Sequence, residues 1–246
     1  MVGAMKRKWM HARNAAAVAA VGALAVGIVS IPAAPAHAAD TITAADQAYF
    51  SYYGLDRARA KGYTGKGVTI AMIDGKVDTS VPELAGANIT VKIPCTITTS
   101  PSVESHGTGV ASILVSADYG VAPKVSLLAY QGNFGGNGDR GASDCDQPGG
   151  VGKDSQPWLL NSAMNDGAQI INLSASTPNE YKELKWVTAR AIAQQVILVN
   201  AAGNDSTNDD DTSLSKWSGV VGVSAIGVDD NRQNYSSWGQ GVVTAS

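Results

Sequence analysis

Short apolar runs rich in Val, Ile and Leu alternate along the chain with longer stretches whose apolar residues recur at helical spacing. The short runs are typical of buried strands, and the longer stretches are typical of helices. We predict strands at residues 68–73, 124–130, 169–173, 196–200 and 220–226. We predict helices at residues 106–116, 158–168 and 181–194. Strands that alternate with helices favour an α/β fold, with a mostly parallel central sheet and helices on both faces.

Three segments depart from this alternation. Residues 39–60 carry an aromatic cluster and predict a short helix or turn that lies on the core. Residues 131–156 contain eight glycines and predict a long surface loop, which in a compact domain is usually functional or mobile. Residues 205–212 form an acidic loop whose oxygens could bind calcium, but we expect a plain solvated loop and no cofactor.

The first 38 residues have the pattern of an export signal. Four basic side chains lie within residues 6–13, an Ala- and Val-rich run covers residues 15–31, and residues 36–38 form a small-x-small cleavage site. The alternative is a membrane anchor, but the apolar run is short for a span and ends at prolines. We therefore expect a signal peptide at residues 1–38, its removal, and a secreted protein with no membrane association and one domain at residues 39–246.

Composition and charge narrow the class of protein. Hydrophobic residues make up 44% of the chain and charged residues 16%, which excludes a disordered, collagen-like or coiled-coil protein. Removal of the first 38 residues takes away four positive charges and changes the net charge from −3 to −7, which gives no case for nucleic-acid binding. Cys95 and Cys145 would reach an oxidising compartment, so we expect them to pair; the alternative is two free buried thiols.

Three polar residues sit where an α/β fold places ligands, at the ends of strands or the start of a helix. Asp74 ends the first predicted strand, His106 opens a predicted helix, and Asn204 follows the strand at residues 196–200. His106 is the only histidine in residues 39–246. A carboxylate can orient an imidazole that transfers protons, and a side-chain amide can donate to an oxyanion.

These residues stand in motifs that resemble those of the subtilisin-like serine proteases. The segment ending at Asp74 is similar to the Asp motif of that family, and Asp78 matches its usual second Asp. Residues 106–111 (HGTGVA) resemble the His motif, and residues 201–204 (AAGN) resemble the oxyanion-Asn motif. Residues 170–176 (IINLSAS) resemble the segment that pairs with substrate as an added strand.

The resemblance implies a three-layer sandwich, a monomer, polypeptide substrates and a serine-type endopeptidase. It implies that Asp74 orients His106, that His106 is the general base and then the general acid, and that Asn204 stabilises the oxyanion. The substrate strand and the pocket beside it would be lined by Ser174, Ala175 and Ser176. Main-chain pairing would provide affinity there, and side-chain pockets would provide selectivity.

The sequence departs from the family in three respects. Gly75 and Lys76 stand where the family usually has Ser or Thr and then Gly, which removes a hydroxyl that could bond the carboxylate of Asp74. Ala175 and Ser176 replace a common Leu-Gly pair. No Gly-Thr-Ser-Met-Ala-like nucleophile motif occurs in the 246 residues.

We therefore expect an endopeptidase whose nucleophilic Ser and remaining carboxyl-terminal part lie beyond Ser246, and no hydrolysis by the chain as written. An inactive, protease-like peptide-binding module is the alternative. A nucleotide-binding α/β domain is disfavoured, because the glycines at residues 62–67 precede their strand and no phosphate-binding motif follows it.

Overall fold

The computed structural model describes residues 41–132, 143–145, 152–175, 182–208, 213–239 and 241–244. The predicted signal peptide, Ser176 and part of the glycine-rich loop lie outside these ranges. Within them, no helix combines the length and the apolar character needed to cross a bilayer.

One parallel sheet organises the described chain, in the order β2-β3-β1-β4-β5-β6-β7. Every neighbouring pair runs parallel, as expected for strands joined by crossovers. The strands are β1 (Thr69–Asp74), β2 (Ile89–Lys92), β3 (Ser126–Gln131), β4 (Ile170–Leu173), β5 (Ile197–Ala201), β6 (Val220–Ser224) and β7 (Val242–Thr244). The five predicted strands are confirmed as β1, β3, β4, β5 and β6, and β2 and β7 are additional edge strands.

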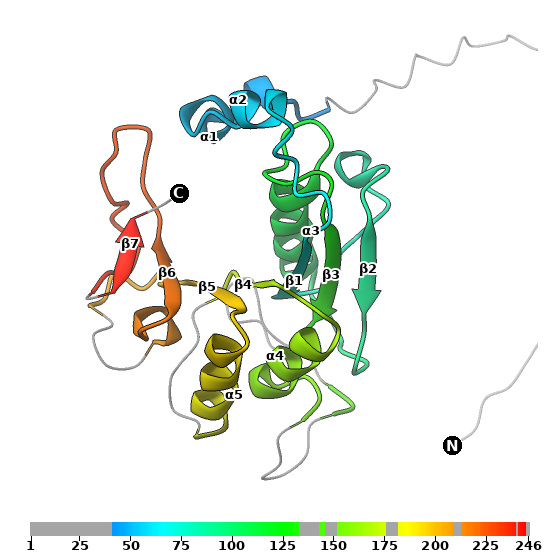
Figure 1. Ribbon diagram of the computed structural model, residues 1–246, viewed down its shortest axis with the longest axis vertical. Helices are drawn as coiled ribbons and strands as arrows, with labels where there is room; N and C mark the ends of the chain where they lie inside the picture. Colours follow the sequence, from blue (N-terminus) through cyan, green and yellow to red (C-terminus); the bar gives the residue numbers. More distant parts are fainter. Residues whose placement is uncertain are drawn as a thin grey trace, which may run out of the picture. The chain divides into compact units, whose positions relative to one another are not determined.

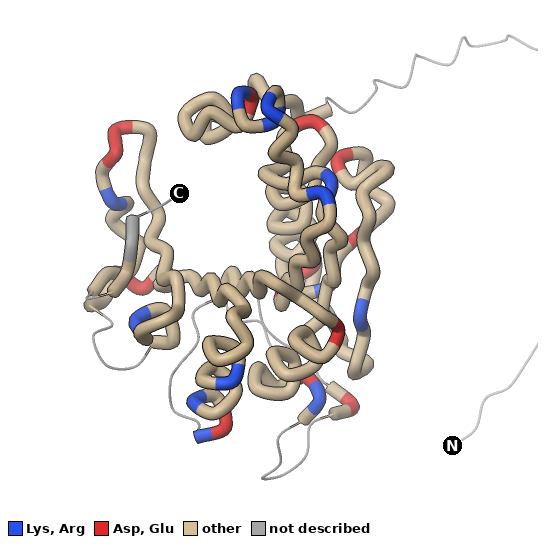
Figure 2. Tube along the Cα trace, in the orientation of Figure 1, with Lys and Arg blue, Asp and Glu red and all other residues tan. Residues whose placement is uncertain are grey.

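Helices cover both faces of this sheet, which confirms the predicted three-layer α/β class (Figure 1). On one face, α3 (Pro101–Val115) packs over β1 and β3. On the other face, α4 (Gln156–Asn165) and α5 (Lys182–Ala193) cover β1, β4, β5 and β6. Most charged positions lie on the helices and connections rather than on the strands (Figure 2), so the sheet itself is an apolar platform.

The helix that carries His106 begins earlier than the sequence predicts. The prediction that His106 opens this helix is wrong, because α3 begins five residues earlier, at Pro101. Ser100 caps the helix by accepting a hydrogen bond from the Val103 backbone N–H at 3.4 Å, and proline is favourable at the first helical position. His106 therefore lies in the second turn, where the helix is already fixed.

Short helices form the amino-terminal segment, as predicted: a 3-10 turn (Ala44–Asp46), α1 (Ala48–Tyr52) and α2 (Leu55–Ala60). Two further 3-10 turns lie at Pro82–Leu84 and Leu214–Lys216.

Two side chains of the amino-terminal segment bind the loop that follows α3. The guanidinium of Arg59 donates to the carbonyls of Ala117 and Asp118 at 3.0 and 2.8 Å. The Tyr49 hydroxyl donates to the Tyr119 carbonyl at 3.0 Å. These bonds hold the segment against the loop.

The predicted disulfide between Cys95 and Cys145 is present, with the two Cα atoms 5.7 Å apart. It joins the segment after β2 to the glycine-rich loop. Beside it, the Asp144 backbone N–H donates to the Thr96 carbonyl at 3.1 Å, and the Thr96 N–H donates to the Asp144 carboxylate at 2.9 Å. A covalent bond and two hydrogen bonds thus join this part of the loop to the segment after β2.

Candidate active site

Asp74 is the last residue of β1, near the middle of the sheet, and its side chain is completely buried. Its Oδ1 accepts a hydrogen bond from the Gly75 backbone N–H at 2.6 Å and lies 2.8 Å from Nδ1 of His106. Its Oδ2 is buried and accepts no hydrogen bond from any residue within the described ranges. Two contacts on one oxygen therefore fix this carboxylate.

The hydrogen bond between Asp74 and His106 defines the protonation of the ring. Because a carboxylate can only accept, Nδ1 carries the proton that it donates, and Nε2 of the neutral imidazole is left as a base. The side chain of His106 keeps 34% of its surface exposed. The bond to Asp74 raises the pKa of His106 above its usual value, although partial burial acts in the opposite direction. The pair has the geometry of an oriented general base.

Two glycines bring α3 close enough to β1 for this bond to form. A Cβ atom on Gly107 would lie 2.6 Å from the Lys76 carbonyl oxygen and 2.9 Å from that of Gly75. A Cβ atom on Gly75 would lie 2.3 Å from Cγ1 of Val103 and 2.7 Å from its carbonyl oxygen. The departure at residue 75 therefore has a steric cause, because α3 occupies the space that a Ser or Thr side chain would need.

Lys76, which departs from the family in the same motif, is accommodated by a surface ion pair. Its ammonium group lies 2.7 Å from the Glu104 carboxylate in the first turn of α3. The hydrogen bond to Glu104 raises the pKa of Lys76. The positive charge of Lys76 is thus directed toward α3 rather than toward Asp74.

Asn204 lies three residues beyond β5 and is exposed. The carboxyl ends of β1 and β5 meet at the same edge of the sheet, since all the strands are parallel. Ser237 fixes the turn on both sides of Asn204: its N–H donates to the Gly203 carbonyl at 2.9 Å, and its hydroxyl accepts from the Asp205 N–H at 3.3 Å. The buried Ser237 thereby orders the turn that presents the amide.

Ser174 and Ala175 follow β4, between the ends of β1 and β5, and both are half-buried. The side chain of Asn200, in β5, donates to backbone carbonyls of this segment. Sequence reasoning assigned no role to Asn200, although a buried amide within an apolar strand is a signal that could have drawn attention to it.

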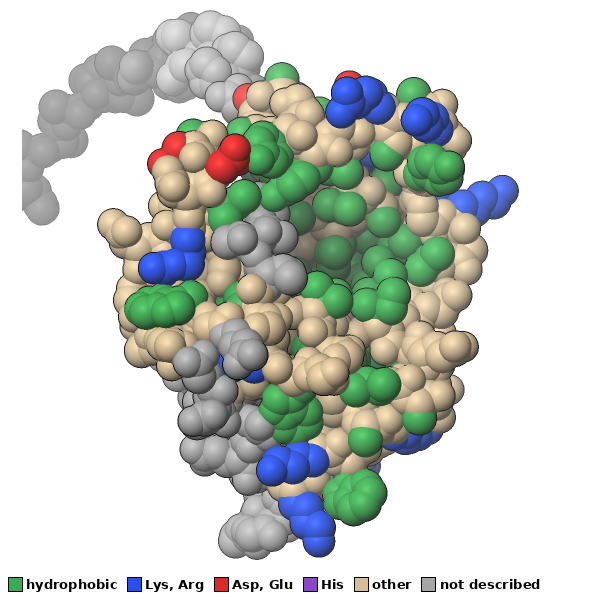
Figure 3. Space-filling model, turned by 60° about the vertical axis from the view of Figure 1, so that its left-hand side comes forward, with side chains coloured by type: hydrophobic (Ala, Val, Ile, Leu, Met, Phe, Trp, Pro, Cys, Tyr) green, Lys and Arg blue, Asp and Glu red, His purple; other side chains and the backbone are tan. Residues whose placement is uncertain are grey.

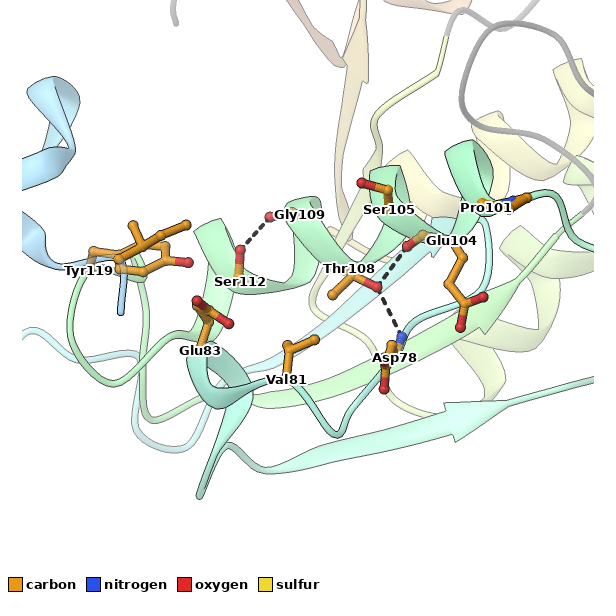
Figure 4. Close-up of a pocket in the computed structure, with 11 residues that line it drawn as sticks. Asp78, Val81, Glu83, Pro101, Glu104, Ser105, Thr108, Gly109, Ser112 and Tyr119 are labelled. Carbon is orange, nitrogen blue, oxygen red and sulfur yellow. Dashed lines mark hydrogen bonds between the residues drawn. The ribbon is translucent and has the colours of Figure 1, made fainter. Parts of the chain in front are cut away.

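A separate cavity of about 460 Å³ lies along α3, and neither Asp74 nor His106 is among its lining residues (Figure 4). Its wall includes Asp78 and Thr108; the Asp78 N–H donates to the Thr108 hydroxyl at 2.9 Å. Asp78 thus supports α3 and lies outside the pair of Asp74 and His106.

The space-filling view shows a hollow lined by hydrophobic side chains (Figure 3). On β6, Val221 is 42% exposed and Val223 is half-buried, so apolar sheet surface is open to solvent within the described ranges.

Comparison with known proteins identifies the family. The model of the subtilase family matches residues 65–245. The chain belongs to the subtilase family. Subtilisin E of Bacillus subtilis (strain 168) is 26% identical to this subtilase over 203 residues, a match that covers 76% of this chain and 49% of that protein. The major intracellular serine protease of the same strain is 28% identical over 195 residues, with 72% and 57% covered. The chain thus spans about half the length of the curated relatives it matches.

Solved structures support the same fold for this subtilase. The prenylagaramide maturation protease PagA superposes with a TM-score of 0.61 at 24% identity, over 78% of this chain and 67% of that one. The patellamide maturation protease PatA superposes with a TM-score of 0.57 at 26% identity, over 74% of this chain and 66% of that one. Asp74, His106 and Asn204 all lie within the matched residues of the family model.

Proposed function

We propose that this chain carries the acid, the base and the oxyanion donor of a secreted, subtilisin-type serine endopeptidase. The observation that carries the proposal is the 2.8 Å hydrogen bond between the fully buried Asp74 and His106 in a chain of the subtilase family. A buried carboxylate that holds Nδ1 leaves Nε2 available to accept a proton from an attacking hydroxyl.

The proposed reaction moves one proton through His106. Nε2 takes the proton of a serine hydroxyl as its oxygen bonds to the scissile carbonyl carbon, and Asp74 stabilises the resulting imidazolium. The amide of Asn204 donates to the oxyanion of the tetrahedral intermediate. The same proton then passes from Nε2 to the leaving amine as the peptide bond breaks, and water later releases the acyl group by the same steps in reverse order. No cofactor takes part.

The serine hydroxyl is the reactant that no motif in the 246 residues supplies. We therefore expect these residues by themselves not to hydrolyse peptides. Polypeptides are the proposed substrates, paired along the segment at Ser174 and Ala175. Export through residues 1–38, no membrane association afterwards and a monomeric state complete the proposal.

A second candidate function is peptide binding without chemistry. It is favoured by one observation, namely that the side chain of Asn200 holds the segment after β4 in place. In this case the chain binds an extended peptide and releases it intact.

The test begins with the coding DNA past the codon for Ser246, read for a Gly-Thr-Ser run, and continues with the native gene product in a fluorescent casein assay. We expect turnover to fall about 10⁶-fold with His106→Ala, about 10⁴-fold with Asp74→Asn and about 10²–10³-fold with Asn204→Ala. The control Thr188→Ala, which alters a buried hydroxyl in α5, is expected to retain turnover. Full turnover by the His106→Ala variant would refute the proposal, and peptide binding without cleavage by the native product would favour the second candidate.

A further inference from the structure

Asn200 is a polar residue in an apolar part of the sheet. It lies in β5, its side chain is completely buried, and the strand before it consists of Ile, Leu and Val. Burying an amide is unfavourable unless its groups form hydrogen bonds, so the partners of Asn200 indicate what the residue does at this position.

Asn200 binds two backbone carbonyls, one at the end of β4 and one just beyond it. Its Nδ2 donates to the Ala175 carbonyl at 2.8 Å and to the Leu173 carbonyl at 3.3 Å. Leu173 is the last residue of β4 and pairs with Asn200 in the register of the two strands. The amide therefore spans from the end of the regular strand to a residue two positions further on, where strand pairing has stopped.

These two hydrogen bonds determine which side of the segment remains available to bind a peptide. Successive peptide groups of an extended chain point to opposite sides. Because Asn200 donates to the carbonyls of Leu173 and Ala175, the carbonyl of Ser174 between them is directed away from Asn200. The Ser174 side chain is held separately, because the amide of Asn172 donates to its hydroxyl at 2.8 Å. The segment is thus held along one side.

The segment at Ser174 and Ala175 lies beside the pair formed by Asp74 and His106. β4 lies between β1 and β5 in the sheet (Figure 1). Leu173 pairs with Ile73, the residue before Asp74. A shift of the backbone at Ser174 would therefore displace a bound peptide relative to His106.

We propose that Asn200 is a positioning residue for substrate: by binding the carbonyls of Leu173 and Ala175, it fixes the segment at Ser174 in the conformation that pairs with an extended polypeptide. This inference rests on the proposed function, which assigns substrate pairing to that segment. Asn200 acts through the backbone of its neighbour, so its loss weakens the binding of any peptide that pairs through its main chain, whatever its side chains.

The experiment measures peptide affinity and stability together in the full chain. The probe is fluorescein-labelled tetra-alanine, followed by fluorescence anisotropy; a fully N-methylated tetra-alanine, which cannot donate backbone hydrogen bonds, is the peptide control. Asn200→Ala removes both bonds, and Asn200→Leu removes them while it keeps the branched shape of the side chain. The matched protein control is Ser224→Ala, because the Ser224 hydroxyl is also buried and donates to a backbone carbonyl, that of Ser237, at 2.8 Å.

Each outcome has a distinct meaning. We expect both Asn200 variants to bind tetra-alanine at least tenfold more weakly than the unaltered chain, and Ser224→Ala to bind within twofold of it, at a temperature where urea titration finds all four proteins folded. Asn200 variants that bind within twofold of the unaltered chain would overturn the inference and leave the proposed function intact. An unaltered chain that binds tetra-alanine no better than the N-methylated peptide would overturn the proposed substrate segment, and the inference with it.

Discussion

Replacing Asp74 by Asn is expected to lower the pKa of His106, because the hydrogen bond to the Asp74 carboxylate is what raises it. The variant keeps the shape of the side chain but removes the charge that lies 2.8 Å from Nδ1. A hydrogen bond to a charged group contributes about 1.5–3 kcal/mol. Because a third of the His106 side chain is exposed, solvent screens the pair, and we expect the lower end of this range.

The same perturbation changes how stability depends on pH. Since folding raises the pKa of His106, the folded chain binds this proton more tightly than the unfolded chain does. The stabilisation is complete below about pH 6.5, the unfolded value, and is lost as the pH rises through the folded-state pKa. In the Asp74→Asn variant only partial burial remains, which lowers the pKa, so the contribution of His106 to this slope should vanish or change sign.

Imidazole NMR titration of the full chain measures the pKa, and urea unfolding between pH 5.5 and 9 measures the slope. His11 and His37 are assigned with His11→Gln and His37→Gln variants. A His106 pKa that changes by less than about 0.3 units in Asp74→Asn, or one below 6.5 in the unaltered chain, would refute the reasoning, because either result means that the carboxylate does not hold the ring in solution.

Three further predictions concern stability. Replacing Cys95 and Cys145 together by Ser should lower the free energy of unfolding by about 4 kcal/mol, from the chain entropy of a 50-residue loop, and a change below about 1 kcal/mol in urea titration would contradict this. Gly107→Ala should destabilise by about 1–3 kcal/mol because its Cβ would meet two backbone oxygens. In the same helix Gly109→Ala, whose Cβ meets no described atom within 4 Å, should stabilise by up to about 1 kcal/mol, and thermal unfolding that ranks the two alike would argue against close packing. Arg59→Met should release the amino-terminal helices at a cost of about 1–2 kcal/mol, detected as faster proteolysis of residues 41–60 with an intact core, and unchanged cleavage would disprove the anchoring.

The sequence predicts the central strands well because their apolar runs are buried on both faces and need no knowledge of their neighbours. β2 (Ile89–Lys92) was missed because it is a four-residue edge strand with two exposed residues, so its pattern resembles that of a loop. The first turn of α3 was missed for a different reason. Only Val103 is buried among its first five residues, so periodicity is weak there, although Ser100 and Pro101 form a recognisable start signal.

The candidate site, too, can be predicted from the sequence only in part. Asp74, His106 and Asn204 are recognisable because their chemistry lies in short local motifs. The role of Asn200 depends on the backbone at the end of β4 and just beyond it, which is 27 and 25 residues away in sequence, and no local pattern contains that information. Ser176, which the resemblance places in the substrate segment, lies outside the described residues and stays a prediction.

The glycine at residue 75 and the hydrogen bond between Asp74 and His106 are linked through the position of α3. A hydroxyl-bearing side chain at residue 75 would collide with Val103, and relief would require α3 to move away from β1. His106 lies on the same helix less than one turn beyond Val103, so such a movement would also carry Nδ1 away from Asp74. Among described residues, the carboxylate therefore depends on the Gly75 N–H and the imidazole alone. It follows that restoring the usual family residue at position 75 would weaken this site rather than strengthen it, because here close helix packing and not a third hydrogen bond keeps the acid and the base together.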